Sequence, residues 1–389
     1  AFLERALKAP GFDNDLTQLS KEALEAGDDP LKQLQLLRRR ASATWFDTIQ
    51  AYYYSNILSG LKTQERNILG NAFNVVPNLL VPLGAAPIDV VRSATTGVPR
   101  TVYLGEIPHG VVGAAIGVHQ GVRNGWFAFT QGFRQAAVRA AAEGMFDAPM
   151  HEMRGGLKNP WNYPFRGLLA MDEFFRAIAW NQELYGRLYT HVRNEGVTTQ
   201  RRMAERMQEI LTSTDPERAD TKTFEHAQRG ADVFAARAVY QEDPGAITKW
   251  LLQAKAPGSP LSLRAAATVI ATFIKTPMAI LRQGFEWSPA GLAMKVTPAG
   301  AEFQDVVSKA LVGRVVDGPE ARAGAQALGR VALGSAALIP MVWLAATGRL
   351  TGAPPDDLGE REEFYAQGKL ANAVRITING TDYWVRYLL

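Results

Sequence analysis

The chain has 389 residues, of which 47% are apolar and 21% are charged, and its formal net charge is +4. This length has room for two or three domains, and so mild a positive charge does not by itself indicate nucleic-acid binding. The sequence contains no cysteine, which excludes disulfides, zinc–thiolate sites and cysteine nucleophiles.

The N-terminal part of the sequence predicts helices and shows no targeting signal. Residues 1–5 include an acid and a base and lack the apolar stretch of a secretory signal. Asp-Pro pairs predict helix starts, because Asp caps free N–H groups and Pro fits the first helical position. The first pair predicts a helix over 31–58, ended by Gly60 and followed by a second helix from about Thr63. The three pairs are Asp29-Pro30, Asp215-Pro216 and Asp243-Pro244.

Four long runs carry no charged side chain, although about a fifth of all residues are charged. They contain Asn, Pro, Gly and Ala, so none is a clean membrane span of about 20 apolar residues. Half-apolar helices of this kind are typical of a protein that buries them in an assembly or moves them into a membrane. The runs cover residues 67–88, 107–122, 265–274 and 331–348.

Glycine recurs at every fourth position in the segment after Ile107, at Gly113, Gly117, Gly121 and Gly125. Glycine costs a helix interior roughly 1 kcal/mol per position relative to Ala. A helix keeps four of them where another backbone must approach closely. The pattern therefore predicts a tightly packed helix with these four residues as helix-packing candidates, and the alternative is a broken loop of short turns.

Residues 162–195 show the clearest helical period. Apolar residues recur in a heptad pattern, which predicts helix-on-helix packing inside a bundle because the stretch is too short for an extended coiled coil. Asn181 interrupts the seam, either to set its register or as a hydrogen-bonded core amide. The other seam positions are Met171, Phe174, Ile178, Tyr185, Leu188 and Val192.

The remaining segments predict connectors and one hairpin. Residues 196–223 and 242–262 predict short helices with connectors, and 256–260 is the strongest linker signal. Apolar residues alternate on both sides of Asn379-Gly380, which is typical of a type I′ hairpin. Because the chain starts without Met and stops within an apparent strand, we expect it to be the ordered part of a longer polypeptide.

These patterns together predict a mainly α fold, a multi-helix bundle with long amphipathic and apolar helices and a small C-terminal β-hairpin. We divide it into an N-terminal helical segment, an apolar glycine-rich segment, a bundle segment, C-terminal helices with an apolar helix, and a final loop and hairpin. The five segments are 1–60, 61–160, 161–256, 257–350 and 351–389.

Sequence motifs for catalysis or cofactor binding are missing. No two of the five histidines have the spacing of a helical metal site, and no nucleophile elbow or dinucleotide fingerprint occurs. The pair Asp172-Glu173 lies on an ordinary amphipathic helix. The sequence therefore predicts no enzyme, no catalytic residue, no cofactor and no metal. The histidines are His109, His119, His151, His191 and His226.

Three segments together resemble large internal virion proteins of tailed bacteriophages. The stretch 55–71 looks like their N-x-L-L-S-G-x-x-T-x-x-x-N motif, and 273–289 is similar to their K-T-P stretch, with Ala279 where Asn is usual. Residues 347–355, then 375–380 and Trp384, look like their apolar helix, Gly/Pro loop and short hairpin. The three segments frame residues 45–389, and none carries a catalytic residue of that family.

The resemblance implies an ejection protein, stored in the capsid and released to form part of a core or trans-envelope channel for delivery of viral DNA. It implies a homo-oligomer with other internal virion, portal or tail proteins as partners, located first in the virion interior and then in the host envelope. Membrane contact and passage of DNA without sequence-specific binding fit the same role. The alternatives are a scaffold for other internal proteins that never touches lipid, a fragment of a peptidoglycan-degrading virion enzyme, and a bacterial pore-forming toxin.

Overall fold

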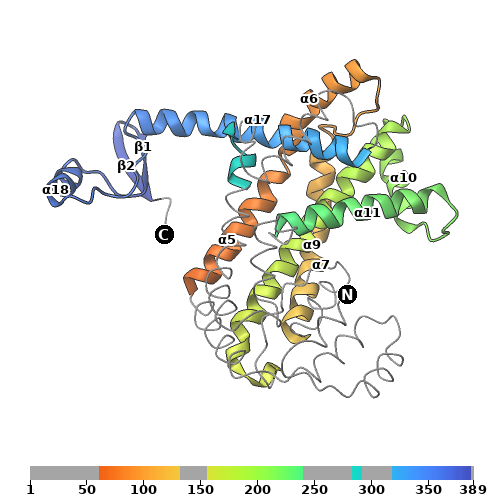
Figure 1. Ribbon diagram of the computed structural model, residues 1–389, viewed down its shortest axis with the longest axis horizontal. Helices are drawn as coiled ribbons and strands as arrows, with labels where there is room; N and C mark the ends of the chain where they lie inside the picture. Colours follow the sequence, from red (N-terminus) through yellow and green to blue (C-terminus); the bar gives the residue numbers. More distant parts are fainter. Residues whose placement is uncertain (1–60, 132–155, 240–282, 291–317, 387–389) are drawn as a thin grey trace, which may run out of the picture.

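The computed structural model describes residues 61–131, 156–239, 283–290 and 318–386 (Figure 1). Several expectations fall outside these residues and stay predictions. They are the helix over 31–58, the helix starts at Asp29-Pro30 and Asp243-Pro244, the uncharged run 265–274 and the linker 256–260.

The described residues confirm a mainly helical fold with a small antiparallel hairpin near the C-terminus. The eight helices in this part of the chain are α5 (Leu61–Asn78), α6 (Val81–Thr96), α7 (Glu106–Gln131), α9 (Tyr163–Asn194), α10 (Gln200–Thr212), α11 (Ala219–Ala238), α17 (Gly318–Ala346) and α18 (Leu358–Ala366). Two 3₁₀ turns, η1 (Gly156–Lys158) and η2 (Pro160–Asn162), precede α9, and the strands are β1 (Ala373–Ile378) and β2 (Thr381–Arg386).

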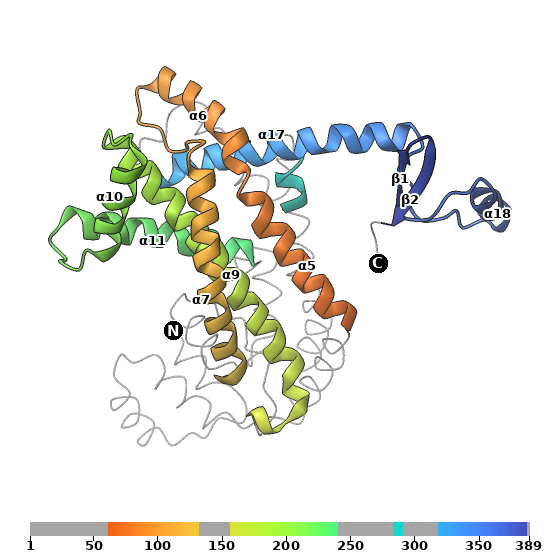
Figure 2. The same cartoon turned by 180° about the vertical axis from the view of Figure 1, so that it is seen from behind.

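Helices α7 and α9 form an antiparallel pair at the centre of the bundle (Figure 2). Gly117 of α7 faces Ile178 of α9, and Gly125, two turns later, faces Ala170. The facing residue moves toward the N-terminus of α9 as α7 advances, so the helices run in opposite directions. Near the end of the described part of α7, Arg166 donates hydrogen bonds to the carbonyls of Phe129 at 2.6 Å and Thr130 at 2.8 Å.

The apolar seam predicted for α9 contacts α7 in its first part and α10 and α11 in its later part. Its first part faces α7, where Asn181 donates to Gln120 at 2.9 Å and to the Ala177 carbonyl of its own helix at 2.8 Å. Asn181 is thus a hydrogen-bonded core amide that also links the two helices. Its later part joins a core cluster with α10 and α11, formed by Leu184, Leu188, Val192, Met203, Met207, Ile210, Ala227 and Ala231.

Helix α17 crosses α6 at a pair of glycines that the sequence patterns did not single out. A Cβ added to Gly84 would lie 2.7 Å from the carbonyl oxygen of Gly329, and one added to Gly329 would lie 2.7 Å from the backbone N of Ala85. Only glycine lets the two backbones approach this closely. Small apolar residues fill the crossing around them, namely Val81, Ala85, Ala86, Val102 and Ala325.

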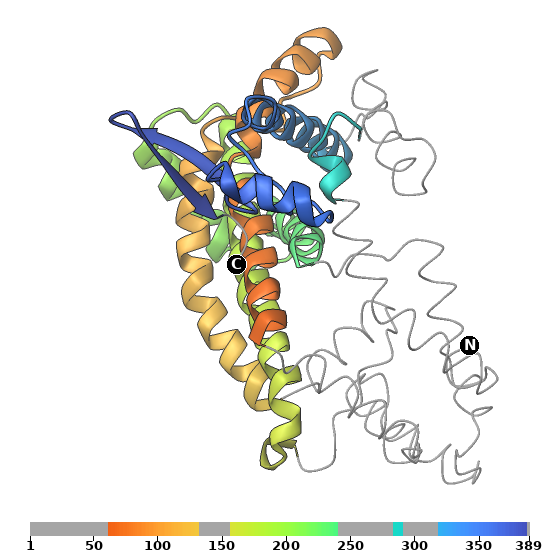
Figure 3. The ribbon, with the colours of Figure 1, turned by 90° about the vertical axis from the view of Figure 1, so that its left-hand side faces the viewer.

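Beyond this crossing α17 extends away from the bundle and ends at the hairpin (Figures 1 and 3). Strand β1 pairs with β2 in the register Val374 to Val385. The two-residue turn has φ of 51° at Asn379 and 79° at Gly380, the positive values that the Asn-Gly pair predicted. Thr351, just after α17, donates its backbone N–H to the Ala373 carbonyl at 2.9 Å and so ties the hairpin to the helix.

One predicted helix start is wrong. Helix α11 begins at Ala219, four residues after Asp215, so Asp215 is not its cap. The Asp215 carboxylate instead accepts a hydrogen bond from the backbone N–H of Glu217 at 3.1 Å. The Asp215 carbonyl accepts one from the Thr221 hydroxyl at 2.6 Å. Asp-Pro favours such turns as much as helix starts, and these hydrogen bonds hold the chain in a turn before α11.

Candidate assembly surface

The four helix-packing candidates all lie on the face of α7 that contacts α9. A Cβ would lie 2.6 Å from the Cα of Ile178 if added to Gly117, and 2.7 Å from the carbonyl oxygen of Phe174 if added to Gly121. Gly113 faces the backbone of Asn181 in the same way, and Gly125 faces Ala170. The glycine face is therefore occupied within the protomer.

Burying the glycine face of α7 turns its branched and aromatic residues outward, because the two sets lie on opposite sides of one helix. Val122 is 62% exposed and Trp126 is 70% exposed. An apolar surface that lines one side of a helix is typical of a contact with a partner. The exposed residues of this outer face of α7 are Val111, Val112, Val118, Val122, Trp126 and Phe127.

Helix α17 has an inner half packed on the bundle and an outer half that stands free of it. The last buried residue of the helix is Gly334, where a Cβ would collide with the carbonyl of Trp287. Residues 335–346 contain no buried position and no charged side chain. We call 335–346 the free half of α17; its exposed large apolar residues are Leu338, Ile339, Met341, Val342 and Trp343.

Two helical stretches of the described chain are long and apolar enough to cross a membrane, by length and composition alone. They are Ala321–Ala346, whose most apolar 18-residue window is 28% buried, and Ile68–Thr96. The second stretch bends between α5 and α6 and contains Asp89 and Arg92, which pair at 2.7 Å in the protein interior. Of the two, the C-terminal stretch is the more continuous and the less buried.

A buried ion network fixes the inner half of α17. Arg322 donates to Glu106 of α7 at 2.7 Å and to Glu183 of α9 at 2.8 Å, and all three side chains are at most 5% exposed. The same guanidinium donates to the carbonyl of Thr101 at 2.6 Å. A buried charge is tolerated only when its partners satisfy it, so one arginine joins α17 to two other helices.

Further groups complete this network. Gln326 of α17 donates to Glu183 at 3.1 Å, and Arg187 of α9 donates to the same carboxylate at 2.8 Å. Burial raises the pKa of Glu183, but the charges of Arg322 and Arg187 more than offset this, so its pKa lies below the ordinary value. Glu183 is therefore ionised, and it neutralises part of the positive charge of both arginines.

The segment between α6 and α7 is held by a second buried carboxylate. Asp89 is fully buried and accepts hydrogen bonds from the backbone N–H of Thr101 at 2.7 Å and of Val102 at 3.0 Å. Arg92 pairs with the same carboxylate and also donates to the Pro99 carbonyl at 2.8 Å. This holds Thr101 where its carbonyl accepts from Arg322.

A third contact lies where α17 leaves the bundle. Glu286, which is 3% exposed, pairs with Arg237 of α11 and lies 3.8 Å from Arg330 of α17. The neighbouring Gln283 donates to the Arg237 carbonyl at 3.1 Å. Gly334 also packs closely against the backbone of Trp287. Residues 283–290 therefore hold α17 in place just before its free half begins.

The other candidate residues have structural neighbours. His109 shares a hydrogen bond of 2.8 Å with the carbonyl of Gly105, and His191 lies 3.2 Å from Glu195. Asp172 accepts a hydrogen bond from Asn71 at 3.2 Å, while His151 lies outside the described residues. Among those residues, no group of three or more His, Asp or Glu side chains is arranged to hold a metal ion.

The charged network was missed by the sequence patterns. Arg322 lies 216 positions from Glu106 and 139 from Glu183, so no local spacing links them. The available signal was an arginine placed in an otherwise Ala- and Gly-rich helix. Comparison with protein-family models, with curated proteins and with solved structures found no match to this chain.

Proposed function

We propose that this chain is an internal virion protein of a tailed phage, ejected to form part of a core or trans-envelope channel through which viral DNA is delivered. The free half of α17 carries the proposal. Its five large apolar residues are exposed around the helix, with Ile339 70% exposed and Val342 64% exposed. A helix that is apolar on all sides is stable where lipid or other protein surrounds it.

The anchoring of the inner half of α17 supports a role in binding for its free half. Two helices, α7 and α9, and residues 283–290 hold the inner half through buried ion pairs, so the outer half extends from a rigid base. Burying apolar surface contributes about 25 cal/mol per Å², which favours insertion or association once a partner is present. The free half would then enter the membrane from one side, because its 12 residues are fewer than the about 20 that cross a bilayer.

The outer face of α7 suits contact between copies of the chain. It lies on a helix whose opposite side is already packed, and its exposed residues are large and apolar, as at the centre of subunit interfaces. Homo-oligomers with a central channel are built by repeating one such contact around a ring. We assign the α7 face to subunit packing and the free half of α17 to lipid.

A scaffold role without lipid contact is the second candidate. The observation that favours it is the buried Asp89–Arg92 pair, which makes the other long apolar stretch a poor membrane segment. In that case the free half of α17 would pack against another internal virion protein. The two roles share the same assembly surface and differ only in what covers the end of α17.

Vesicle flotation with dye release tests the proposal, at neutral and mildly acidic pH, with the oligomer mass measured by analytical ultracentrifugation with and without lipid. Flotation with leakage and formation of oligomers supports the ejection role. Oligomers that neither float nor release dye support the scaffold. A protein that is monomeric in solution and with lipid, and that does not float, contradicts both.

A further inference from the structure

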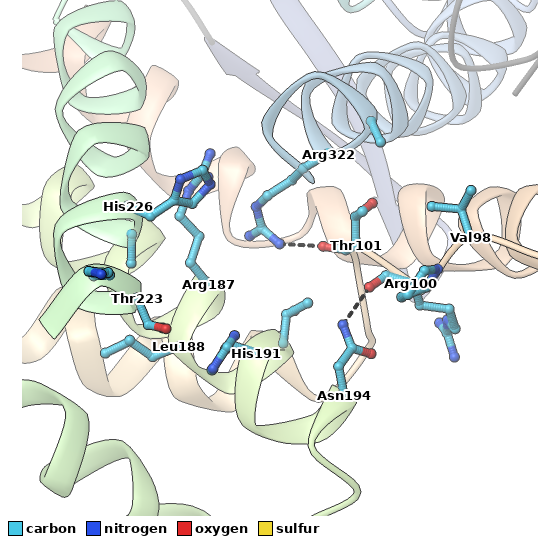
Figure 4. A pocket seen from close by; sticks show the side chains of 15 residues that line it. Val98, Arg100, Thr101, Arg187, Leu188, His191, Asn194, Thr223, His226 and Arg322 are labelled. Atoms are coloured by element: carbon cyan, nitrogen blue, oxygen red, sulfur yellow. Dashed lines mark hydrogen bonds between the residues drawn. The ribbon is translucent and has the colours of Figure 1, made fainter. Parts of the chain in front are cut away.

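A pocket of about 610 Å³ opens between α9, α11, the start of α17 and the segment that precedes α7. This volume is within the range of small-molecule sites. Figure 4 shows its side chains converging from these elements, with Arg322 donating to the Thr101 carbonyl and Asn194 donating to the Arg100 carbonyl. The pocket is separate from the outer face of α7 and from the free half of α17.

The lining of this pocket is basic. The described residues that line it include four permanent cations and two histidines, and no Asp or Glu. Two of the cations are already balanced, because Arg322 and Arg187 pair with Glu106 and Glu183 behind the wall. Of the other two cations, Arg100 donates to the carbonyl of Val102 at 3.0 Å and lies over the Tyr103 ring. The unbalanced charge comes from Lys222, for which the described residues provide no ion-pairing carboxylate.

Several donors at the pocket are free to meet a ligand. Lys222 and His226 stand one turn apart on α11, with Thr223 beside them, so ammonium, imidazole and hydroxyl groups line the same side of the pocket. Grouped cationic and hydroxyl donors are the chemistry that recognises phosphate oxygens.

The local electrostatics agree with an anion. Burial lowers the pKa of His226, and the charges of Arg187, Arg229 and His191 lower it further. The ring is therefore neutral at pH 7, first because of its burial and then because the surrounding charges are positive. The rest of the lining is apolar, which suits the carbon part of an organic ligand; these residues are Val98, Pro99, Leu188, Ala227 and Ala321.

We propose that this pocket binds a small organic phosphate of about nucleotide size, with Lys222, Thr223 and His226 facing the phosphate group. A phosphate monoester carries a charge of about −1.5 to −2 at pH 7, which is opposite in sign to the unpaired charge of Lys222. The site is independent of assembly, so the chain binds this ligand as a monomer or as an oligomer.

Isothermal titration calorimetry of the purified chain in a phosphate-free, low-salt buffer tests the proposal. The probes are AMP, ribose 5-phosphate and inorganic pyrophosphate, with adenosine as the matched neutral compound. We expect AMP to show saturable binding at about 1 mM or below, and adenosine to bind at least about tenfold more weakly. Equal affinity for all three phosphates would mean that the pocket recognises the phosphate group alone. Tighter binding of AMP would mean that it also recognises the base.

The variant Lys222→Gln should weaken AMP binding about tenfold, the effect of removing one charge-assisted hydrogen bond. Lys158→Gln is its matched control, since it removes the same charge from a lysine outside the pocket. An unchanged thermal midpoint shows that Lys222→Gln folds. The proposal is overturned if no phosphate probe saturates at about 1 mM, if adenosine binds as well as AMP, or if both variants lose affinity equally.

Discussion

Gly117 of α7 and Ile178 of α9 meet backbone to backbone: a Cβ on Gly117 would lie 2.6 Å from the Ile178 Cα. No side-chain rearrangement relieves a collision with backbone, so the separation of the two helices depends on this glycine. The same helix exposes its valines on the other side. The Gly117–Ile178 contact thus links the core of the protomer to the surface that we assign to assembly.

Gly117→Ala should lower the free energy of unfolding by about 1–3 kcal/mol, because overpacking a tight contact outweighs the gain in helix propensity. Gly70→Ala is the matched control, since Gly70 is inside α5 with nothing within 4 Å of an added Cβ. There we expect a gain of up to about 1 kcal/mol. Urea unfolding checks both, and a stabilised Gly117→Ala protein would contradict the close packing of α7 on α9.

Arg322→Ala should lower the free energy of unfolding by about 3–5 kcal/mol, because it leaves Glu106 and Glu183 buried without their shared cation. Hydrogen exchange should show faster exchange in the inner half of α17. Arg201→Ala removes an exposed ion pair with Glu205 and should cost about 0–1 kcal/mol. Losses of similar size in the two variants would mean that Arg322 does not hold α17 to the bundle.

Acidification should release α17 before the bundle unfolds. The pKa of Glu183 is lower in the folded protein than its ordinary value of 4.5, so Glu183 stabilises the fold above about pH 4.5. This contribution is lost as the pH falls through the lowered folded-state pKa and Glu183 becomes protonated. Hydrogen exchange and urea unfolding at steps between about pH 7 and pH 3 measure it.

A matched comparison identifies the source of this acid sensitivity. Glu183→Gln should lose stability at neutral pH and show a smaller further loss on acidification, because the titrating group is gone. Glu205→Gln, at an exposed pair, should keep the pH dependence of the unmodified chain. Equal pH dependence in all three proteins would place the acid-sensitive group elsewhere.

The double variant Ile339→Ser, Val342→Ser should reduce partitioning into vesicles about 100-fold, since burial of each side chain contributes about 1.5 kcal/mol or more. Both side chains are exposed, so urea unfolding of the lipid-free chain should change by less than about 0.5 kcal/mol. Val233→Ser, at a valine of α11 that is 73% exposed, is the control and should float like the unmodified chain. Normal flotation of the double variant would exclude the free half of α17 as the lipid contact.

The sequence alone determined the elements whose signals are local. The heptad of 162–195 predicted α9, the glycine repeat predicted a helix where α7 lies, and Asn379-Gly380 predicted the hairpin turn. Each signal concerns residues within a few positions of one another, where backbone preference and period decide the outcome. The wrong helix start predicted at Asp215-Pro216 has the same origin. The Asp-Pro motif occurs both in turns and at helix starts, and hydrogen bonds with Thr221 and Glu217 favour the turn in this protein.

The surfaces that the helices use are set by contacts between distant parts of the chain. That the glycines of α7 face α9, that Gly84 meets Gly329, and that Arg322 pairs with two glutamates more than 100 positions away all depend on long-range packing. The same packing buries the first half of α17 and leaves 335–346 exposed, although both halves are rich in small apolar residues. Composition measures how apolar a helix is, whereas the position of its partners sets which part of it remains free to bind.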